Sequence, residues 1–295
     1  MRRPTLWLSA ICLLLLVSRA DAVIVAGTGG TGSQNTTSTG AGTGWNYTGT
    51  VNGSSGVYLG QYGGGYWVLT ADHVSAGSFT LGGYTYDAVA NSAANPVAGA
   101  DLEVFRITSA NPAAMTALSS LSNLSLASSD SSIGTSVTMI GNGRGGRSTD
   151  TVLWTSGWQE TEFQLLAAYE GYTYGSSGQV LRWGTNHVGG NPYVNSGTEI
   201  FLTDFDETAG EAQGSAGDSG GGVFNSSGTL VGLMIVIGGY NGQPANTAVF
   251  GNITGSANIA QYSTAILTAI PEPSVSMLVL GAIPFAWWAL RRRMA

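Results

Sequence analysis

Cysteine is almost absent from this sequence. The single residue, Cys12, lies in an apolar run that belongs to a removable secretory signal by its pattern. No cysteine remains in the rest of the chain, which excludes disulfides from the mature fold. Stability must therefore come from a packed core alone, which about 250 residues are enough to supply.

Charge is also scarce. Acidic and basic residues make up 9% of the chain, lysine does not occur, and the formal net charge is −7. A nucleic-acid interface needs clustered basic side chains, so this balance argues against a nucleic-acid partner. Gly, Ser, Thr and Asn dominate instead, as in exported β-rich proteins.

Only two histidines are present, so at most two imidazole side chains could act as a base. Residues 217–221 read Gly-Asp-Ser-Gly-Gly and place Ser219 in a glycine-rich loop. A serine hydroxyl is a weak nucleophile unless a neighbouring base, oriented by a carboxylate, activates it. Read as G-x-S-x-G, the run matches the nucleophile elbow of α/β-hydrolases, whose acid and histidine follow the serine. Neither histidine nor aspartate follows Ser219, so that interpretation fails, and a glycine-rich loop without chemistry is the remaining alternative.

Read as Gly-Asp-Ser-Gly-Gly, the run resembles the nucleophile loop of chymotrypsin-like (trypsin-like) serine proteases, whose triad follows the order His, Asp, Ser. Residues 69–73, Leu-Thr-Ala-Asp-His, are similar to the family's Leu-Thr-Ala-Ala-His segment, with Asp72 in place of the second alanine. His73 ends a strand-like apolar run, which would hold a base rigidly. The other histidine, His187, has no such context and is expected in a loop.

The acid is expected to be Asp101. Residues 100–104, Ala-Asp-Leu-Glu-Val, resemble the family's Asp-(Ile/Leu)-Ala-Leu segment, and Asp87 is the main rival. The resemblance spans roughly residues 44–266 but is specific only in these three windows. It implies His73 as general base, Asp101 as orienting acid and Ser219 as nucleophile. The backbone N–H groups of Gly217 and Ser219 would form the oxyanion hole.

Substrate preference depends on Gln213. In the resembled family the residue six before the nucleophile lines the base of the specificity pocket, and here it is neutral. A preference for Lys or Arg is therefore not expected, and a neutral or apolar side chain is. The following wall segment, residues 231–239, departs from the family's Ser-Trp-Gly.

Short strand-like runs recur between glycine-rich turns. They cover residues 57–59, 66–70, 137–140, 180–183, 199–203, 222–224 and 230–237. The pattern suits two packed antiparallel β-barrels. The resemblance implies an all-β, chymotrypsin-like fold with six-stranded barrels and the active site in the cleft between them. His73 and Asp101 would lie in the first barrel and Ser219 in the second.

The ends of the chain predict its destination. Residues 1–22 have a basic start, an apolar core and small residues before an expected cleavage site after Ala22. Residues 23–44 are predicted to be a Gly/Ser/Thr-rich linker and residues 45–269 the protease domain. Residues 270–295 contain Pro-Glu-Pro, an apolar segment at 275–290 that is marginally long enough to span a membrane, and an Arg-Arg-Arg tail.

This tail resembles the PEP-CTERM sorting signal of Gram-negative bacteria. The resemblance implies export, transient anchoring in the inner membrane, processing by an exosortase-type enzyme, and delivery to the cell surface or extracellular matrix. A simple membrane anchor is the alternative.

Three further patterns in the sequence are weaker indications of function. Residues 24–27, Ile-Val-Ala-Gly, faintly resemble the activated N-terminus of zymogen-type relatives, whose amine pairs with the aspartate before the nucleophile, here Asp218. Residues 141–147 are expected to form a mobile loop. Four acidic residues between 204 and 211 are expected to be a solvated loop rather than a calcium site, so no metal or cofactor is predicted.

The sequence thus predicts a secreted serine endopeptidase that cleaves protein or peptide substrates through an acyl-enzyme. The alternative is an inactive protease fold that serves as a binding or structural module of the cell surface or matrix.

Overall fold

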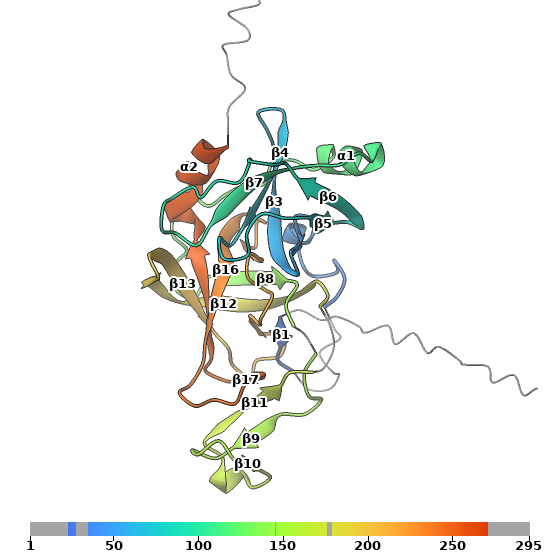
Figure 1. The fold of residues 1–295 in the computed structure, drawn as a ribbon. Helices are drawn as coiled ribbons and strands as arrows, with labels where there is room; N and C mark the ends of the chain where they lie inside the picture. The colour runs from blue at the N-terminus through green and yellow to red at the C-terminus, as the bar shows by residue number, and fades with distance from the viewer. Residues whose placement is uncertain (1–22, 28–34, 145, 176–178, 271–295) are drawn as a thin grey trace, which may run out of the picture.

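Two closed barrels, each of six antiparallel strands, make up most of the described chain (Figure 1). The computed structural model describes residues 23–27, 35–144, 146–175 and 179–270, and the structural findings concern these residues. The predicted all-β, two-barrel fold is confirmed by the strand pairings. The barrels follow one another along the chain, so the groups expected to cooperate come from separate halves of the sequence.

The first barrel has the strand order β2-β3-β4-β7-β6-β5. Its strands are β2 (Thr48–Val51), β3 (Ser54–Tyr62), β4 (Gly65–Thr70), β5 (Phe79–Leu81), β6 (Tyr84–Ala88) and β7 (Glu103–Thr108). Gly82 and Gly83, with φ of 58° and 83°, make the two-residue turn between β5 and β6. Such turns need positive φ at both positions, which favours glycine.

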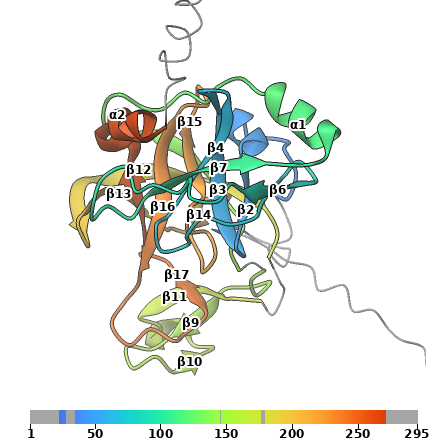
Figure 2. The same ribbon diagram turned by 45° about the horizontal axis from the view of Figure 1, so that its top comes forward.

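The second barrel has the order β12-β13-β18-β16-β15-β8. Its strands are β8 (Ser136–Gly141), β12 (Arg182–Asn195), β13 (Thr198–Asp204), β15 (Gly222–Asn225), β16 (Leu230–Gly238) and β18 (Ile253–Asn258). The helix α2 (Ile259–Ala269) follows β18 directly and buries Ile259, Tyr262 and Ile266. In Figure 2 it lies at the opposite end of the molecule from strands β9 and β10.

Alternation along single strands explains how one strand serves two cores. In β3, Val57 and Leu59 join the hydrophobic cluster shared by both barrels, whereas Tyr58 joins the cluster inside the first barrel. In β8, Ile140 belongs to the shared cluster and Met139 to the interior of the second barrel. Successive side chains point to opposite faces of a strand. Both faces of these strands are therefore apolar and buried.

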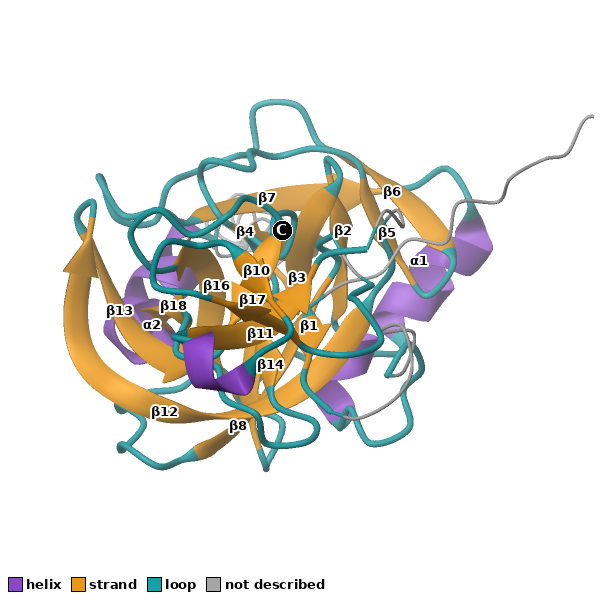
Figure 3. Ribbon diagram, turned by 90° about the horizontal axis from the view of Figure 1, so that it is seen from below, coloured by secondary structure: helices purple, strands orange, loops and turns teal. Residues whose placement is uncertain are grey.

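A smaller four-stranded sheet projects from the second barrel and was not predicted from the sequence (Figures 1 and 3). Its order is β10 (Glu160–Thr161), β9 (Val152–Trp154), β11 (Tyr169–Thr173) and β17 (Thr247–Val249). The 3-10 helix η2 (Gln164–Leu166) lies in the connection between β10 and β11. The strands have two to five residues. Runs this short show no clear period, which is why the sequence pattern missed them.

An aromatic stack reinforces this sheet. Trp158 lies parallel to Tyr169 with ring centroids 4.1 Å apart, and Tyr240 packs on Tyr169 at 4.9 Å. The indole N–H of Trp158 also donates to the carbonyl of Asn241. The stack therefore fixes the segment around residue 240, which leaves the end of β16, to the small sheet.

The first barrel carries one helix of its own, α1 (Pro112–Ser119). Asn111 caps it by accepting a hydrogen bond from the Ala113 N–H, and Pro112 occupies the first turn, where its missing N–H costs nothing. Ala114 and Leu118 pack into the first barrel's core.

Several sequence predictions need correction. Residues 23–26 are buried rather than part of a linker, because β1 (Ile24–Val25) pairs with β14 (Ala212–Gln213). The 3-10 helix η1 (Thr43–Asn46) and the buried Ala41 likewise place the end of that segment against the core. His187 lies in β12, opposite Ser136 of β8, and not in a loop.

No helix of the described ranges is long and apolar enough to cross a membrane. The predicted signal peptide at 1–22 lies outside these ranges, as does the sorting signal predicted at 270–295, with its apolar segment at 275–290, except for Ile270, which is buried. Both remain predictions.

Candidate active site

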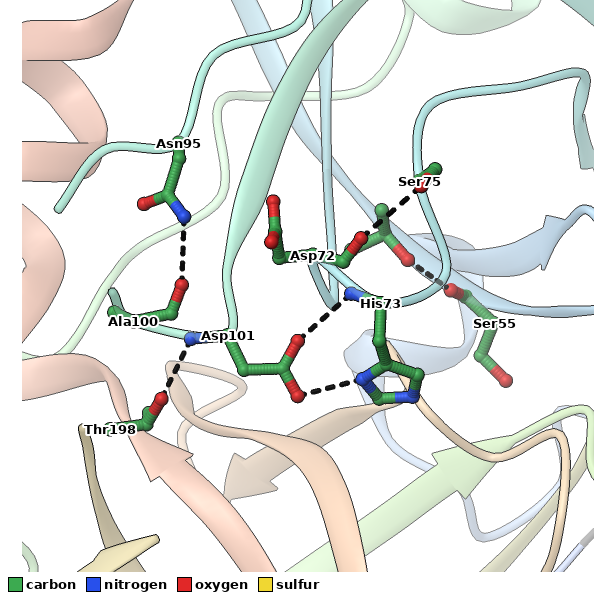
Figure 4. A network of polar contacts seen from close by, with 9 residues as sticks. Ser55, Asp72, His73, Ser75, Asn95, Ala100, Asp101 and Thr198 are labelled. Carbon is green, nitrogen blue, oxygen red and sulfur yellow. Dashed lines mark hydrogen bonds and ion pairs between the residues drawn. The ribbon is translucent and has the colours of Figure 1, made fainter. Parts of the chain in front are cut away.

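His73 and Asp101 are joined by two hydrogen bonds (Figure 4). The imidazole Nδ1 lies 2.7 Å from the Asp101 Oδ2, and the His73 backbone N–H donates to Oδ1 at 3.0 Å. His73 follows β4 by three residues and Asp101 precedes β7 by two, and these strands are paired neighbours in the first barrel. Since the carboxylate accepts at Nδ1–H, it fixes the tautomer whose Nε2 lone pair is free to take a proton.

The second barrel holds Asp101 in place. Its backbone N–H donates to the Oγ1 of Thr198, at the start of β13, over 2.7 Å. On the other side, Asn95 donates to the carbonyl of Ala100 (Figure 4). The rival acid Asp87 lies in β6, opposite Thr108, and is exposed. Of the two acids, Asp101 is the one in contact with His73.

Ser219 lies on a loop that Ser55 of β3 attaches to the first barrel. The Ser55 N–H donates to the Ser219 carbonyl at 2.9 Å, and the Ser55 Oγ donates to the Gly217 carbonyl at 3.0 Å. Ser55 in turn accepts from Thr70 Oγ1 through its carbonyl oxygen and from the Asn142 N–H through its Oγ. Thr70 ends β4, three residues before His73. These contacts place the half-buried Ser219 beside the end of the strand that carries the histidine.

The backbone at Gly217 suits an oxyanion hole. Its φ is +99°, which strains any residue with a side chain, and a Cβ there would lie only 3.0 Å from the backbone Cα of Gly143. Among the described residues, the N–H groups of Gly217 and Ser219 have no acceptor, whereas those of Asp218, Gly220 and Gly221 do. Two unpartnered donors flanking residue 218 are what a developing oxyanion would need.

Asp218 fixes the conformation of this loop from inside the protein. It is 2% exposed, and its carboxylate accepts from the Gly143 N–H, the Ser215 N–H and the Ser215 hydroxyl at 2.7–2.9 Å. The Val23 backbone N–H also donates to it. Burial raises the pKa of Asp218 to about 6 although these hydrogen bonds lower it. Gly143 and Arg144, expected in a mobile loop, are therefore bonded to residues 215–218.

Two buried arginines hold the N-terminal strand next to Asp218. Arg182 donates to the carbonyl of Val23, and Arg147 donates to the carbonyls of Val25 and Gly27. The Arg147 guanidinium also lies 4.0 Å from the ring centre of Tyr172. Burial lowers the pKa of Arg147. The position that the sequence compared with an activated N-terminus is thus packed against the nucleophile loop, with Val23 as the residue in contact.

Gln213 lines a cavity of about 260 Å³ at the end of β16. Ile237, Gly238 and Gly239, from the segment predicted as a pocket wall, line it as well. Asn252 was not predicted, because nothing in the sequence shows that the turn before β18 folds against this cavity. Ser55, Thr70 and Thr198 were missed for the same reason: they act through contacts between residues far apart in the chain.

Two of the four acidic residues between 204 and 211, Asp206 and Glu211, interact with each other. The pKa of Glu211 is raised to about 8, first by burial and then by a hydrogen bond to Asp206 and that residue's negative charge. The same hydrogen bond lowers the pKa of Asp206. Within the described ranges no group of three or more His, Cys, Asp or Glu residues is placed to hold a metal ion.

The chain matches no model of a known protein family and no curated protein sequence. In structure it is similar to the inactive form of the Rv3671c protease, with 13% identity and a TM-score of 0.43 over 83% of this chain and 98% of the other. It is also similar to Kallikrein-related peptidase 10, with 16% identity and a TM-score of 0.46 over 78% and 97%. At these values the likeness carries no argument about residues or activity, and the two-barrel architecture rests on the chain's own strand pairings.

Replacing Ser55 by Ala should destabilise the protein by about 1–3 kcal/mol, because the buried Asn142 N–H and Gly217 carbonyl each lose a partner. Ser54→Ala, one residue earlier in β3 and without such contacts, is the matched control and should change little. Urea unfolding of both variants measures the difference. Equal stability of the two variants would show that the Ser55 hydroxyl does not join the barrels.

Asp218 predicts a specific pH dependence of stability. In the unfolded chain its pKa is the ordinary 3.8, and in the fold it is about 6. The folded state therefore binds the proton more tightly between these values. The free energy of unfolding should fall as pH rises from about 4 to about 6, by on the order of 3 kcal/mol from this group.

Asp218→Asn should remove this contribution, whereas the exposed Asp87→Asn should keep it. Unfolding in urea at several pH values between 4 and 7 gives the slope for each protein. Only the slope is compared, because the substitution also changes the loop's hydrogen bonds. A slope in Asp218→Asn identical to that of the unaltered protein would contradict the assignment.

Proposed function

We propose that this protein is a serine endopeptidase that hydrolyses peptide bonds through Ser219, His73 and Asp101. The observation that carries the proposal is the pair of hydrogen bonds between Asp101 and His73. His73 follows β4, and the Ser219 loop is attached near the end of the same strand through Ser55 and Thr70. The His73 side chain is 49% exposed, so a substrate has access to it.

In the proposed mechanism the Ser219 Oγ attacks the scissile carbonyl carbon while His73 Nε2 takes the hydroxyl proton. Asp101 stays ionised and stabilises the resulting imidazolium through Nδ1–H. The negative charge on the carbonyl oxygen is met by the N–H groups of Gly217 and Ser219. His73 then gives its proton to the leaving amine as the C–N bond breaks, which leaves an acyl-enzyme. Water, deprotonated by His73, hydrolyses that ester and restores Ser219.

The proposed setting is outside the cell. The basic, apolar and small-residue pattern of residues 1–22 supports export, and the tail at 270–295 supports transient anchoring in the inner membrane. Its likeness to a PEP-CTERM signal supports processing by an exosortase-type enzyme and delivery to the surface or matrix of a Gram-negative bacterium. Protein or peptide substrates would be met there.

Purified mature protein should react with a fluorophosphonate probe, because an activated serine hydroxyl displaces its leaving group and becomes phosphonylated. Ser219→Ala should abolish labelling, and His73→Ala should reduce it to background. Asp101→Asn should lower kcat for peptide cleavage by about four orders of magnitude. Gel fluorescence and peptide turnover measure these effects, with circular dichroism to show that each variant folds.

Absence of labelling in a folded, unaltered protein would overturn the enzyme proposal. The chain would then be a binding or structural module with a protease fold.

The N-terminal contact leads to a second prediction. Cleavage after Ala22 would turn the Val23 N–H into an ammonium group at the buried Asp218 carboxylate, and a charged pair stabilises the loop more than a neutral hydrogen bond does. Protein that begins at Val23 should label about tenfold faster at pH 7 than the same protein with Val23 acetylated. Intact mass spectrometry verifies each N-terminus. Equal labelling rates would mean that the free amine has no role.

A further inference from the structure

We propose that the cavity lined by Gln213 and Asn252 binds the side-chain carboxamide of a substrate residue, so that the protein cleaves after glutamine, and more weakly after asparagine. This inference rests on the proposed peptidase function and specifies its substrate class. It follows from the position of the cavity, its two unpartnered buried amide groups and the absence of charge in its described lining.

The cavity lies beside the nucleophile loop. Gln213 precedes Ser219 by six residues, and the loop is bonded to β16 through the Gly220 N–H and the Met234 carbonyl at 2.8 Å. Ile237, three residues further along β16, lines the cavity. Three residues of strand cover about 10 Å, the scale of one extended substrate side chain and its backbone. A side chain that enters the cavity can thus belong to a residue bound at Ser219.

The size of the cavity fits one side chain. Its volume of about 260 Å³ is below the roughly 300–1,000 Å³ that is typical of sites for whole small molecules. Gly238 and Gly239 contribute no side chains to its wall, while Ile237 and Tyr240 are 42% and 39% exposed and stand at its rim. The entrance is therefore open to solvent and the floor is not.

Two carboxamides at this cavity have unmet hydrogen-bonding capacity. Gln213 and Asn252 are each 2% exposed, and Gln213 Oε1 and Asn252 Oδ1 have no hydrogen-bond partner among the described residues. The Asn252 Oδ1 lies close to Gly239, 3.5 Å from where a Cβ would be. Buried carbonyl oxygens without donors are costly, and a ligand NH₂ group that reached them would remove that cost.

Three of the four other polar side chains of the lining, those of Gln243, Thr247 and Tyr240, have partners within the protein, and the fourth is the hydroxyl of Tyr174. The Gln243 side chain donates to Thr247 and accepts from the Tyr240 N–H, and the Thr247 hydroxyl donates to the Pro244 carbonyl. The Tyr240 hydroxyl donates to the Phe250 carbonyl. Gln213 and Asn252 are thus the lining residues with buried oxygens that have no partner among the described residues, and the Tyr174 hydroxyl lies in the same lining.

The chemistry of these two groups favours a carboxamide over other side chains. An apolar side chain would exclude water and leave both amide oxygens without a hydrogen-bond donor. A lysine or arginine would be buried without a counter-charge, because no acidic residue lines the cavity in the described part of the chain. A glutamate would bring carboxylate lone pairs against carbonyl lone pairs. A glutamine NH₂ supplies two donors for two acceptors, and its oxygen can accept from an amide NH₂ of the cavity.

The side chains of glutamine, methionine, glutamate and lysine are similar in length. Differences in cleavage among peptides that carry them therefore report the chemistry of the side chain rather than its size. A set of peptides that differ only at the residue before the scissile bond (Gln, Asn, Met, Glu or Lys) should give kcat/KM at least about tenfold higher for Gln than for Met. Asn should rank second because its shorter side chain reaches the floor less well. The Glu and Lys peptides should be the poorest.

Gln213→Met conserves volume and removes the carboxamide, so the Gln-to-Met ratio should fall to near one. Asn252→Leu is a second, independent variant with the same expected direction. Gln61→Met, on the exposed end of β3, is the control and should keep the original ratio. Fluorophosphonate labelling, which does not depend on this pocket, shows whether each variant keeps an intact nucleophile.

Binding of the same peptides to Ser219→Ala, measured by calorimetry, gives the ranking without turnover. A Gln preference in binding supports the inference even if no peptide is cleaved, in which case the peptidase proposal alone fails. A preference for Met, Glu or Lys, in cleavage or in binding, would overturn the inference while labelling still supports the peptidase. Retention of the Gln preference in both pocket variants would overturn it as well.

Discussion

The hydrogen bonds of Ser55 are the constraint on which the site depends. Ser55 belongs to the first barrel, yet its backbone N–H and its hydroxyl bond to the nucleophile loop and to Asn142 of the second. Because the residue is fully buried, these bonds do not compete with water. They hold the loop against the end of β4, and the Asp101–Thr198 bond holds the acid from the opposite side. The relative position of the two barrels therefore determines the geometry of the candidate triad.

A second constraint acts from beneath the loop. Asp218 is surrounded by N–H and hydroxyl donors from the segment that follows β8, from its own loop and from the N-terminal segment, which two buried arginines hold in place. The negative charge of a buried carboxylate is tolerated only when such donors surround it, and the raised pKa shows that they compensate burial incompletely. The loop conformation and the N-terminal strand are consequently linked through one ionisable group.

The small sheet supports one side of the cavity. Its strands pack Trp158 and Tyr169 against Tyr240, and Tyr240 stands at the rim of the cavity that Gln213 and Asn252 line. One side of the cavity wall, at Tyr240, is thus supported by residues outside both barrels. The candidate triad thus depends on the two barrels, whereas the cavity is lined by β14, by the end of β16, by the segment around residue 240 and by the turn before β18.

The sequence determined the two-barrel class, because β-branched and aromatic runs between glycine turns depend on local backbone preferences. It also identified His73, Asp101 and Ser219 as candidates, because short motifs in a fixed order can be recognised without knowledge of the contacts. Only the tertiary structure decided what surrounds them. Ser55 and Asn252 carry no local signal, and the four-stranded sheet is built from runs too short to show a period. Val23 was assigned to a linker, yet it lies against Asp218 because strand pairing with β14 brings it there. Contacts between residues far apart in sequence depend on packing, and local pattern does not encode them.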